Sequence, residues 1–157
     1  MIRTGIGYDA HQLAKKEELI IAGIEIPFDK GSVGHSDGDA LTHAIIDAIL
    51  GAAALGDLGD YFPSDDDKWK DSNSLDLLDD SIKLLKSKGF EINNIDSVII
   101  MQKPKLKKYI LDIRKNLAEV LDITIDQISV KATTVDNLGA IGNGEGWAAQ
   151  AVVTISK

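Results

Sequence analysis

Residues 39–55 read DALTHAIIDAILGAAAL, and this stretch decides the fold. It is rich in Ala, Leu and Ile and contains no proline, so it predicts a helix. Apolar residues almost encircle the segment, which indicates that the helix is buried. We interpret Gly51 within it as a position of close packing against a neighbouring element. A helix buried in this way is a central element of its domain.

Strand patterns lie on both sides of this helix. Residues 2–8 and 19–26 precede it, and the second run closes at Pro27, which cannot donate to a central ladder. We therefore expect a strand pair near the N-terminus. Three further strands are predicted towards the C-terminus, over residues 95–102, 128–134 and 146–156.

Two more helices complete the order of elements. Residues 74–88 place leucine and isoleucine at helical spacing, with Ser72 or Ser74 as the N-cap. Residues 105–121 are predicted to be helical as well. The resulting order, ββααβαββ, predicts a single domain over residues 1–157, of the α/β class and α+β type, with a mixed β-sheet and helices packed on one face.

Composition limits the chemistry that the chain can perform. With 157 residues, 44% of them hydrophobic, it can bury a core without disulfides. Cysteine is absent, which excludes a thiolate nucleophile and a thiolate metal site, so a bound metal must use nitrogen and oxygen ligands. The net charge of −8 argues against nucleic acid as a partner. The only arginines are Arg3 and Arg114, so a polyphosphate ligand would need lysines, backbone amides and metal ions to balance its charge.

Two features bear on location. No apolar stretch reaches the roughly 18 residues of a membrane span, and the first residues lack a basic region followed by a long apolar run. No membrane is therefore expected as a partner. The chain is predicted to be cytoplasmic, or to reside in a plastid-type organelle if it is a processed eukaryotic protein.

All three histidines fall between residues 11 and 43, each within a few positions of an aspartate. Asp9 and His11 stand two apart at the end of a predicted strand, so their side chains share one face. His43 on the following helix can supply a third ligand. Two imidazoles and a carboxylate leave the fourth position of a tetrahedral zinc ion open, and cobalt or manganese would also fit. Each residue taken alone is more often structural, but the three together favour a divalent metal site.

Carboxylates flank His43 in the sequence. Asp39 and Asp47 stand four residues to either side, on the same helical face. One hypothesis is that one of them accepts the second imidazole N–H and fixes the tautomer. The alternative is that they are carboxylates of the helix N-terminus or part of a solvated face. The preceding residues 35–39, HSDGD, could present amides to a phosphate oxygen or form an ordinary capping turn.

A second polar cluster begins at Thr133, Thr134 and Asp136 and continues into glycines up to Gly146. Its hydroxyls and amides could grip phosphate oxygens, with Mg²⁺ on Asp136, but the spacing matches neither the Walker A loop nor the dinucleotide fingerprint. The structural alternative is a glycine-rich hairpin or bulge. Of the lysines around Pro104, most are expected to be solvated and one or two to contact a ligand.

Three motifs resemble the family of 2-C-methyl-D-erythritol 2,4-cyclodiphosphate synthases. They are GIGYDAHQL at residues 5–13, HSDGDALTHAIIDAILGAAALGDLGDYFP at 35–63 and KATTVDNLGAIGNGEG at 131–146. The resemblance implies a phosphorus-oxygen lyase that converts 4-diphosphocytidyl-2-C-methyl-D-erythritol 2-phosphate to 2-C-methyl-D-erythritol 2,4-cyclodiphosphate with release of CMP, in non-mevalonate isoprenoid biosynthesis. It also implies a homotrimer with active sites between subunits, and a cytidine diphosphate as the small-molecule partner.

The resemblance also implies roles for residues. Asp9, His11 and His43 would bind Zn²⁺ or another divalent transition metal. His35 and Thr134 would be catalytic, and Asp136 would hold Mg²⁺ or Mn²⁺ on the diphosphate. The implied substrate-binding residues are Asp9, His11, His35, Ser36, Asp57, Leu58, Gly59, Phe62, Pro63, Ser64, Asp65, Asp66, Met101, Gln102, Lys103, Pro104, Lys105, Leu106, Lys107, Thr133, Thr134, Val135 and Asp136. Asp136 stands where members usually carry Glu and Asn143 where many carry Arg, which puts Mg²⁺ binding and a phosphate contact from that loop in question.

Two other functions would use the same residues. A divalent-metal phosphohydrolase would activate water at the metal and give an open-chain phosphate beside CMP, where the synthase gives a cyclic diphosphate. In a nonenzymatic oligomer with a structural metal, protein side chains would have to fill every coordination position of the ion. The sequence offers only three convincing ligands.

Overall fold

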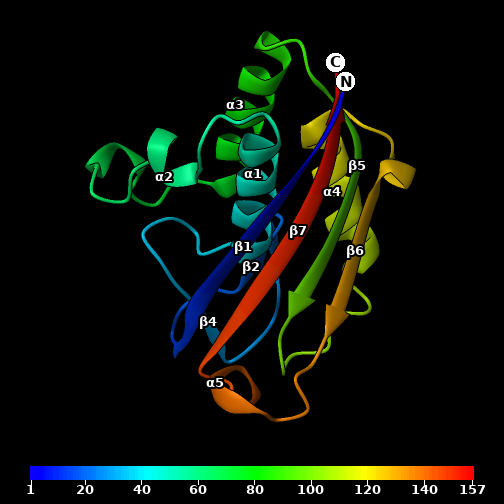
Figure 1. The fold of residues 1–157 in the computed structure, drawn as a ribbon. Helices are drawn as coiled ribbons and strands as arrows, with labels where there is room; N and C mark the ends of the chain where they lie inside the picture. Colours follow the sequence, from blue (N-terminus) through cyan, green and yellow to red (C-terminus); the bar gives the residue numbers. More distant parts are fainter.

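Figure 1 shows the computed structural model, which describes all of residues 1–157. A five-stranded sheet runs through it in the order β4-β1-β7-β5-β6. Its strands are β1 (Ile2–Lys15), β4 (Lys30–Val33), β5 (Glu91–Ile100), β6 (Ile128–Thr133) and β7 (Gly146–Ser156). Neighbouring strands are antiparallel except β5 and β6, which are parallel. The predicted mixed sheet is confirmed.

The three long helices lie on one face of the sheet, as predicted (Figure 1). They are α1 (Ala40–Ala52), α3 (Ser74–Ser87) and α4 (Ile110–Leu121). Helix α1 is buried along β1 and β7, and α3 packs against α1. The remaining helical segments are single turns, namely α2 (Leu58–Tyr61), η1 (Asp67–Trp69), η2 (Ile125–Gln127) and α5 (Gly139–Gly142). None of the helices is both long and apolar enough to cross a membrane.

Two glycines allow α1 to lie directly on β1. Odd-numbered residues of β1 face the helices and even-numbered ones face away, so Gly5 and Gly7 are buried while Ile6 is 64% exposed. A Cβ atom on Gly7 would lie 1.9 Å from the carbonyl oxygen of Ala44, and one on Gly5 would lie 2.0 Å from that of Ala48. Strand and helix are therefore in contact backbone to backbone.

The interpretation of Gly51 as a close-packing position is wrong. Gly51 is exposed, and a Cβ atom there would meet nothing within 4 Å. Helix α1 turns its alanine side towards β1, so the close approach falls on the strand glycines and not on the helix glycine.

The predicted strand over residues 19–26 is wrong as part of the main sheet. It forms a separate hairpin of β2 (Ile20–Ile21) and β3 (Ile24–Glu25), while β1 pairs with β4 and β7. Ala22 and Gly23 have positive φ angles of 49° and 72°. Two consecutive residues of this kind make the tight turn that joins antiparallel strands, and they interrupt the extended run.

Two helix starts differ from the prediction. Helix α4 begins at Ile110 and not at residue 105, because Leu106 turns into the core and its carbonyl oxygen accepts the N–H of Tyr109 in a separate turn. Helix α3 is confirmed, but its N-cap is Asn73, whose side chain accepts the N–H of Leu75 at 2.9 Å, and neither flanking serine fills that role.

The other face of the sheet carries no long helix (Figure 1). Apolar side chains of β1 and β7 stand exposed on it: Ile2 is 71% exposed, Ile6 64%, Tyr8 58% and Val152 39%. Ile6 and Val152 are partners in the strand register, so their side chains lie next to each other. Exposed apolar side chains gathered on one surface commonly mark a protein interface.

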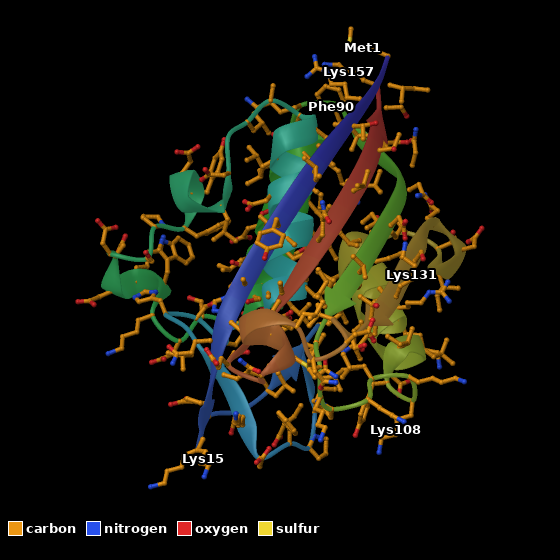
Figure 2. The ribbon with its side chains drawn as sticks, turned by 60° about the horizontal axis from the view of Figure 1, so that its bottom comes forward. Met1, Lys15, Phe90, Lys108, Lys131 and Lys157 are labelled. Carbon is orange, nitrogen blue, oxygen red and sulfur yellow. The ribbon has the colours of Figure 1, made fainter.

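The two ends of the chain meet at one end of the sheet (Figure 2). The N-terminal ammonium group of Met1 donates to the carbonyl oxygen of Lys157 at 2.7 Å. The Lys157 Nζ atom lies 5.2 Å from the centroid of the Phe90 ring. From this end, β1 and β7 pair without interruption from Ile2 to Gln12, which fixes the register of β1.

Candidate metal centre and substrate cavities

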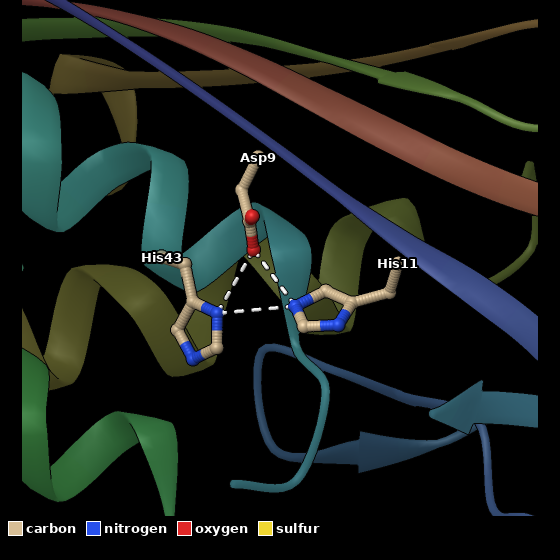
Figure 3. Close-up of side chains that lie close together, drawn as sticks. All are labelled: Asp9, His11 and His43. Atoms are coloured by element: carbon tan, nitrogen blue, oxygen red, sulfur yellow. Dashed lines mark hydrogen bonds and ion pairs between the residues drawn. The ribbon is translucent and has the colours of Figure 1, made fainter. Parts of the chain in front are cut away.

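Asp9, His11 and His43 come together where β1 passes the first turn of α1 (Figure 3). Asp9 and His11 follow Gly5 and Gly7 on the helix-facing side of β1, because side chains alternate along a strand. The close approach of α1 at the glycines then brings His43 to them. The strand continues to Lys15, so Asp9 and His11 both lie within a regular strand and not at its end.

The three side chains are spaced as ligands of one ion would be. The Oδ2 atom of Asp9 lies 2.8 Å from His11 Nε2 and 2.9 Å from His43 Nδ1. The two ring nitrogens are 3.4 Å apart. Ligands bound at about 2 Å in a tetrahedral arrangement lie roughly 3.3 Å from one another. Only small outward movements separate the present arrangement from that spacing.

Hydrogen bonds on the outer side of each ring fix which nitrogen faces the cluster. His11 Nδ1 donates to the carbonyl oxygen of Val33 at 3.0 Å, which leaves the lone pair on Nε2. His43 Nε2 lies 2.8 Å from Ser74 Oγ, so Nδ1 is the atom that faces Asp9. Two imidazole nitrogens and a carboxylate oxygen converge, and this donor set fits a divalent metal ion. The prediction that these residues form a group able to hold such an ion is confirmed.

The charges in the group are complementary. Burial alone would raise the pKa of Asp9, but its interactions with the neighbouring His11 and His43 outweigh burial and hold that pKa well below its usual range. Burial lowers the pKa of His11, yet Asp9 and the Val33 carbonyl group produce a net rise. Asp9 is therefore ionised at neutral pH and available as an anionic ligand.

The hypothesis that Asp39 or Asp47 holds the outer nitrogen of His43 is wrong. Asp39 is fully buried and caps α1, where it accepts the N–H and the hydroxyl of Thr42 at 3.1 and 2.6 Å. Asp47 accepts the N–H of Leu58 at 2.8 Å and so joins α1 to α2. For Asp39 the alternative, a carboxylate of the helix N-terminus, is the correct one.

Burial gives Asp39 an unusual titration. Desolvation raises the pKa of Asp39 to about 6, the hydrogen bond from Thr42 opposes the rise, and the charge of Asp37 adds to it. An acid whose pKa is raised on folding stabilises the fold while it is protonated, below about pH 4. That contribution is lost as the pH rises through about 6.

Asp39→Asn is therefore expected to raise the free energy of unfolding by about 1–3 kcal/mol at pH 8 and to change it little at pH 4. The amide keeps an acceptor for the Thr42 N–H and a donor for the Thr42 hydroxyl, but carries no charge to desolvate. Urea unfolding of the variant and the wild type at the two pH values measures the difference in their free energies of unfolding. The titration of the groups that the two proteins share cancels in this difference. The same change at both pH values would show that the charge of Asp39 is not its cause.

A cavity of about 220 Å³ opens beside Asp9, His11 and His43, which we call the metal group. It is lined by these three residues and by His35, Ser36, Leu58, Phe62, Ser64, Trp69 and Leu77. Trp69 and Leu77 were not predicted, because nothing in the sequence pattern distinguishes them from other apolar residues. The rings of Phe62 and Trp69 meet edge to face at 5.0 Å and form an apolar wall. This cavity thus combines a polar side, formed by the group that could hold a metal ion, with an apolar side.

A second cavity, of about 470 Å³, lies where β5 and β6 end. It is lined by predicted residues Met101, Gln102, Pro104, Lys105, Leu106, Lys107, Thr133 and Thr134, and by Ile110, Val130, Lys131 and Ala132. Apolar walls combined with hydroxyl and lysine side chains suit a ligand that has both a flat organic part and an anionic part.

The remaining predicted residues line neither cavity: Asp57, Gly59, Pro63, Asp65, Asp66, Lys103, Val135 and Asp136. Asp57 caps α2 and forms a capping box with Asp60. Asp136 is exposed, with a φ angle of 52°, and the next residue, Asn137, donates its N–H to Gln102 Oε1 at 3.1 Å. Because Gln102 lines the second cavity, Asp136 stands near its rim.

The glycine segment before β7 takes a form that the sequence did not indicate. Residues 139–142 form the helical turn α5, and neither a hairpin nor a bulge is found there. A Cβ atom on Gly142 would lie 2.2 Å from the carbonyl carbon of Asn137, so glycine is required for the turn to close. The side chain of Asn143 lies 3.4 Å from Glu145 Oε1.

The two cavities are separate on one chain and share no lining residue. The strand register sets one row of residues across β1, β7, β5 and β6: Asp9, Ala149, Ile99 and Ala132. At about 4.8 Å per strand, β1 and β6 are about 14 Å apart at this level. His35 and Thr134, the two residues predicted to be catalytic, therefore lie in different cavities of the same chain.

The chain is similar to known proteins along its whole length. The model of the YgbB family matches residues 2–156. The 2-C-methyl-D-erythritol 2,4-cyclodiphosphate synthase of Alkaliphilus oremlandii is 52% identical over 156 residues, which are 99% of each chain. A solved structure of a 2C-methyl-D-erythritol-2,4-cyclodiphosphate synthase in a CDP-bound form is 32% identical, with a TM-score of 0.90 over 98% of this chain and 100% of that one.

A further solved structure, the bifunctional IspDF from Campylobacter jejuni, is 42% identical with a TM-score of 0.95. The match covers 99% of this chain but 42% of the bifunctional one, so this chain corresponds to a part of that protein. The match to the family model over residues 2–156, and the identity of about half to a relative of the same length, confirm the resemblance seen in the motifs. The chain belongs to the YgbB family, that of the 2-C-methyl-D-erythritol 2,4-cyclodiphosphate synthases.

Proposed function

We propose that this chain closes 4-diphosphocytidyl-2-C-methyl-D-erythritol 2-phosphate into 2-C-methyl-D-erythritol 2,4-cyclodiphosphate, with release of CMP, in non-mevalonate isoprenoid biosynthesis. It is then a phosphorus-oxygen lyase that acts as one domain over residues 1–157. The observation that carries this proposal is the convergence of Asp9, His11 and His43 beside a cavity, in a chain of this family. The bacterial origin of the relatives supports a cytoplasmic location.

The reaction needs cations more than it needs a protein nucleophile. An oxygen of the 2-phosphate attacks the β-phosphorus of the same molecule, and the bond from that phosphorus to the bridging oxygen breaks, so that CMP leaves with this oxygen. Because the nucleophile belongs to the substrate, a chain without cysteine can perform the step. The reacting groups are both anionic, and they must be neutralised and aligned for in-line attack.

The metal group is proposed to hold Zn²⁺, which accepts mixed nitrogen and oxygen donors with a position left open for substrate. When bound, the ion supplies positive charge to phosphate oxygens. Asp9 and the two histidines hold it in place. Asp136, at the rim of the second cavity, is proposed to hold Mg²⁺ or Mn²⁺ on the diphosphate, since hard cations favour carboxylate oxygens.

Each cavity is proposed to grip one end of the substrate. In the first, His35 and Ser36 contact the methylerythritol phosphate, and residues 62–66 border the erythritol. At the second, residues 101–107 form the cytidine side together with Thr133 and Thr134, and Asp57 and Gly59 hold the ribose from the adjacent subunit. Holding both ends makes ring closure probable for a flexible molecule, and His35 and Thr134 would then stand on either side of the reacting phosphates.

A homotrimer would complete the active site. The two cavities share no lining residue, and strands β1 and β6 beside them are about 14 Å apart on one chain, so a neighbouring subunit is needed to bring the cavities face to face. The bare sheet face with Ile6, Tyr8 and Val152 offers an apolar surface for that contact. Sedimentation equilibrium should give three times the chain mass of 16.9 kDa. A fully active monomer would contradict the proposal.

Product analysis tests the function directly. The purified protein is incubated with the cytidine substrate, Mg²⁺ and Zn²⁺, and the products are identified by phosphorus NMR. A cyclic diphosphate beside CMP is the expected result. An open-chain phosphate beside CMP would instead identify a phosphohydrolase that uses the same metal group.

Asp136→Ala is expected to raise the Mg²⁺ concentration needed for half-maximal activity by at least about fivefold, which corresponds to about 1 kcal/mol. Zinc content should stay the same, because Asp136 is not part of the group of Asp9 and the two histidines. Magnesium titrations and metal analysis measure both quantities, with Asp80→Ala, at an exposed aspartate of α3, as the control. Loss of zinc with an unchanged Mg²⁺ requirement would show that the two ions are assigned to the wrong residues.

A further inference from the structure

The outer nitrogen of His43 meets a chain of hydrogen bonds, through Ser74 to Asp37, that was given no role in the reaction described above. His43 Nε2 lies 2.8 Å from the Oγ atom of Ser74, the first residue of α3. Ser74 Oγ is hydrogen-bonded to Asp37 Oδ1, and the Ser74 N–H donates to Asp37 Oδ2 at 2.9 Å. Ser74 is 0% exposed and His43 is 7% exposed, so the contact between them is shielded from water, while Asp37 is half-buried.

The chemistry of the three groups sets the direction of each bond. A carboxylate only accepts, so the single hydroxyl hydrogen of Ser74 must point at Asp37. The Ser74 oxygen is then left as an acceptor towards His43, and Nε2 must carry the hydrogen. The other nitrogen, Nδ1, keeps its lone pair, and it is the atom that lies 2.9 Å from Asp9 in the metal group.

A second serine does not take this role. Ser36 Oγ also approaches His43 Nε2, at 3.2 Å, but Ser36 is only half-buried and lines the cavity proposed to receive the substrate phosphate. Ser74 is closer, is fully buried and is backed by a carboxylate. Because Ser74 belongs to α3, this helix contacts the metal group in addition to β1 and α1, which carry the group's three residues.

We infer that Ser74 and Asp37 are positioning residues of the metal group, in which Asp37 acts on His43 through the Ser74 hydroxyl and thereby fixes the tautomer and orientation of that ring. The inference rests on the proposed metal role of Asp9, His11 and His43. A carboxylate behind a metal-bound histidine commonly contributes 10- to 100-fold to metal affinity. Here the carboxylate of Asp37 reaches the His43 ring through the Ser74 hydroxyl and not directly.

The test measures zinc affinity on metal-free protein by competition with a chromophoric chelator. Ser74→Ala is expected to bind zinc about 10- to 100-fold more weakly than the wild type. Ser81→Ala is the matched control, since Ser81 is a buried serine of the same helix that donates to the Leu77 carbonyl oxygen at 2.8 Å and does not touch His43. Its zinc affinity should be unchanged.

Asp37→Asn provides an independent variant if Ser74→Ala fails to fold. As a single substitution it should weaken zinc binding. In a protein that already carries Ser74→Ala it should cause no further loss of zinc affinity, because Asp37 acts through the Ser74 hydroxyl. In the zinc-loaded wild type, the hydrogen-bonded Nε2–H of His43 should give a slowly exchanging proton NMR signal that Ser74→Ala removes. A purely structural role would lower the melting temperature and leave both readouts in place.

The outcomes separate the inference from the function it rests on. Zinc binding by the wild type with equal affinity in Ser74→Ala and Ser81→Ala would overturn the positioning role alone. A wild type that binds no zinc would overturn the proposed metal role, and this inference with it. Weak binding in Ser74→Ala and Asp37→Asn, with a double variant no weaker than Ser74→Ala, would support it.

Discussion

Replacing His43 with alanine is expected to lower kcat/KM by at least about a thousandfold, equivalent to about 4 kcal/mol of transition-state stabilisation. The variant loses one of the three converging ligand atoms, so Asp9 and His11 are left as a pair. Two ligands hold a divalent ion poorly, and without its charge the substrate phosphates repel each other during attack. Phosphorus NMR of the products and zinc analysis of the protein measure the two losses.

The fold should survive this change. Alanine is the best helix former, and α1 remains anchored by buried Ile45, Ile46 and Ile49. Far-ultraviolet circular dichroism and sedimentation of His43→Ala should therefore match those of the wild type. An unfolded variant would mean that His43 is needed for the core, and the loss of activity could then not be attributed to the metal.

Gly7→Ala is expected to act on the stability of the fold, in contrast to His43→Ala, which should lose activity and stay folded. The new Cβ atom would lie 1.9 Å from the Ala44 carbonyl oxygen and 2.8 Å from the Ala48 nitrogen, both of which are backbone atoms that no rotamer change can move. Overpacking usually costs 1–3 kcal/mol, and a clash of this kind belongs at or above the upper end, so we expect at least about 3 kcal/mol. For a chain of this length the melting temperature should fall by roughly 6–12 °C or more.

Gly51→Ala is the matched control for Gly7→Ala. Gly51 lies in α1 with open space around its Cα, so the same substitution should stabilise the helix by about 0.5–1 kcal/mol. Thermal unfolding of both variants measures the contrast. Equal and small effects would show that α1 can shift away from β1 at little cost, and the backbone contact would then not be what positions His43.

The parts of the fold that follow from local pattern were predictable from the sequence. The helix over residues 39–55 and the strand over 146–156 are found within a few residues of the expected bounds, because their periodicity extends over many residues. The run 19–26 has the composition of a strand, but the positive φ angles at Ala22 and Gly23 turn it into a separate hairpin. Composition does not report backbone angles.

The candidate site divides in the same way. Asp9 and His11 could be paired from strand alternation, and His43 added because few residues of its type occur in the chain. The partner of His43 could not be found from the sequence, since Ser74 stands 31 positions further along the chain and resembles any serine at the start of a helix. The carboxylates that did stand near His43 in the sequence are occupied by Thr42 and Leu58. Contacts of this kind depend on how α3 packs on α1, which no local pattern encodes.

Because β1 and β7 pair continuously from Ile2 to Gln12, a slip of one residue between them would carry Asp9 and His11 together to the far side of the sheet, away from His43. If the group holds a divalent ion as proposed, metal uptake is an all-or-none measure of correct strand pairing. Titrating a refolded, metal-free preparation with the proposed ion would then give, from the stoichiometry, the share of molecules in the native register before any substrate is added.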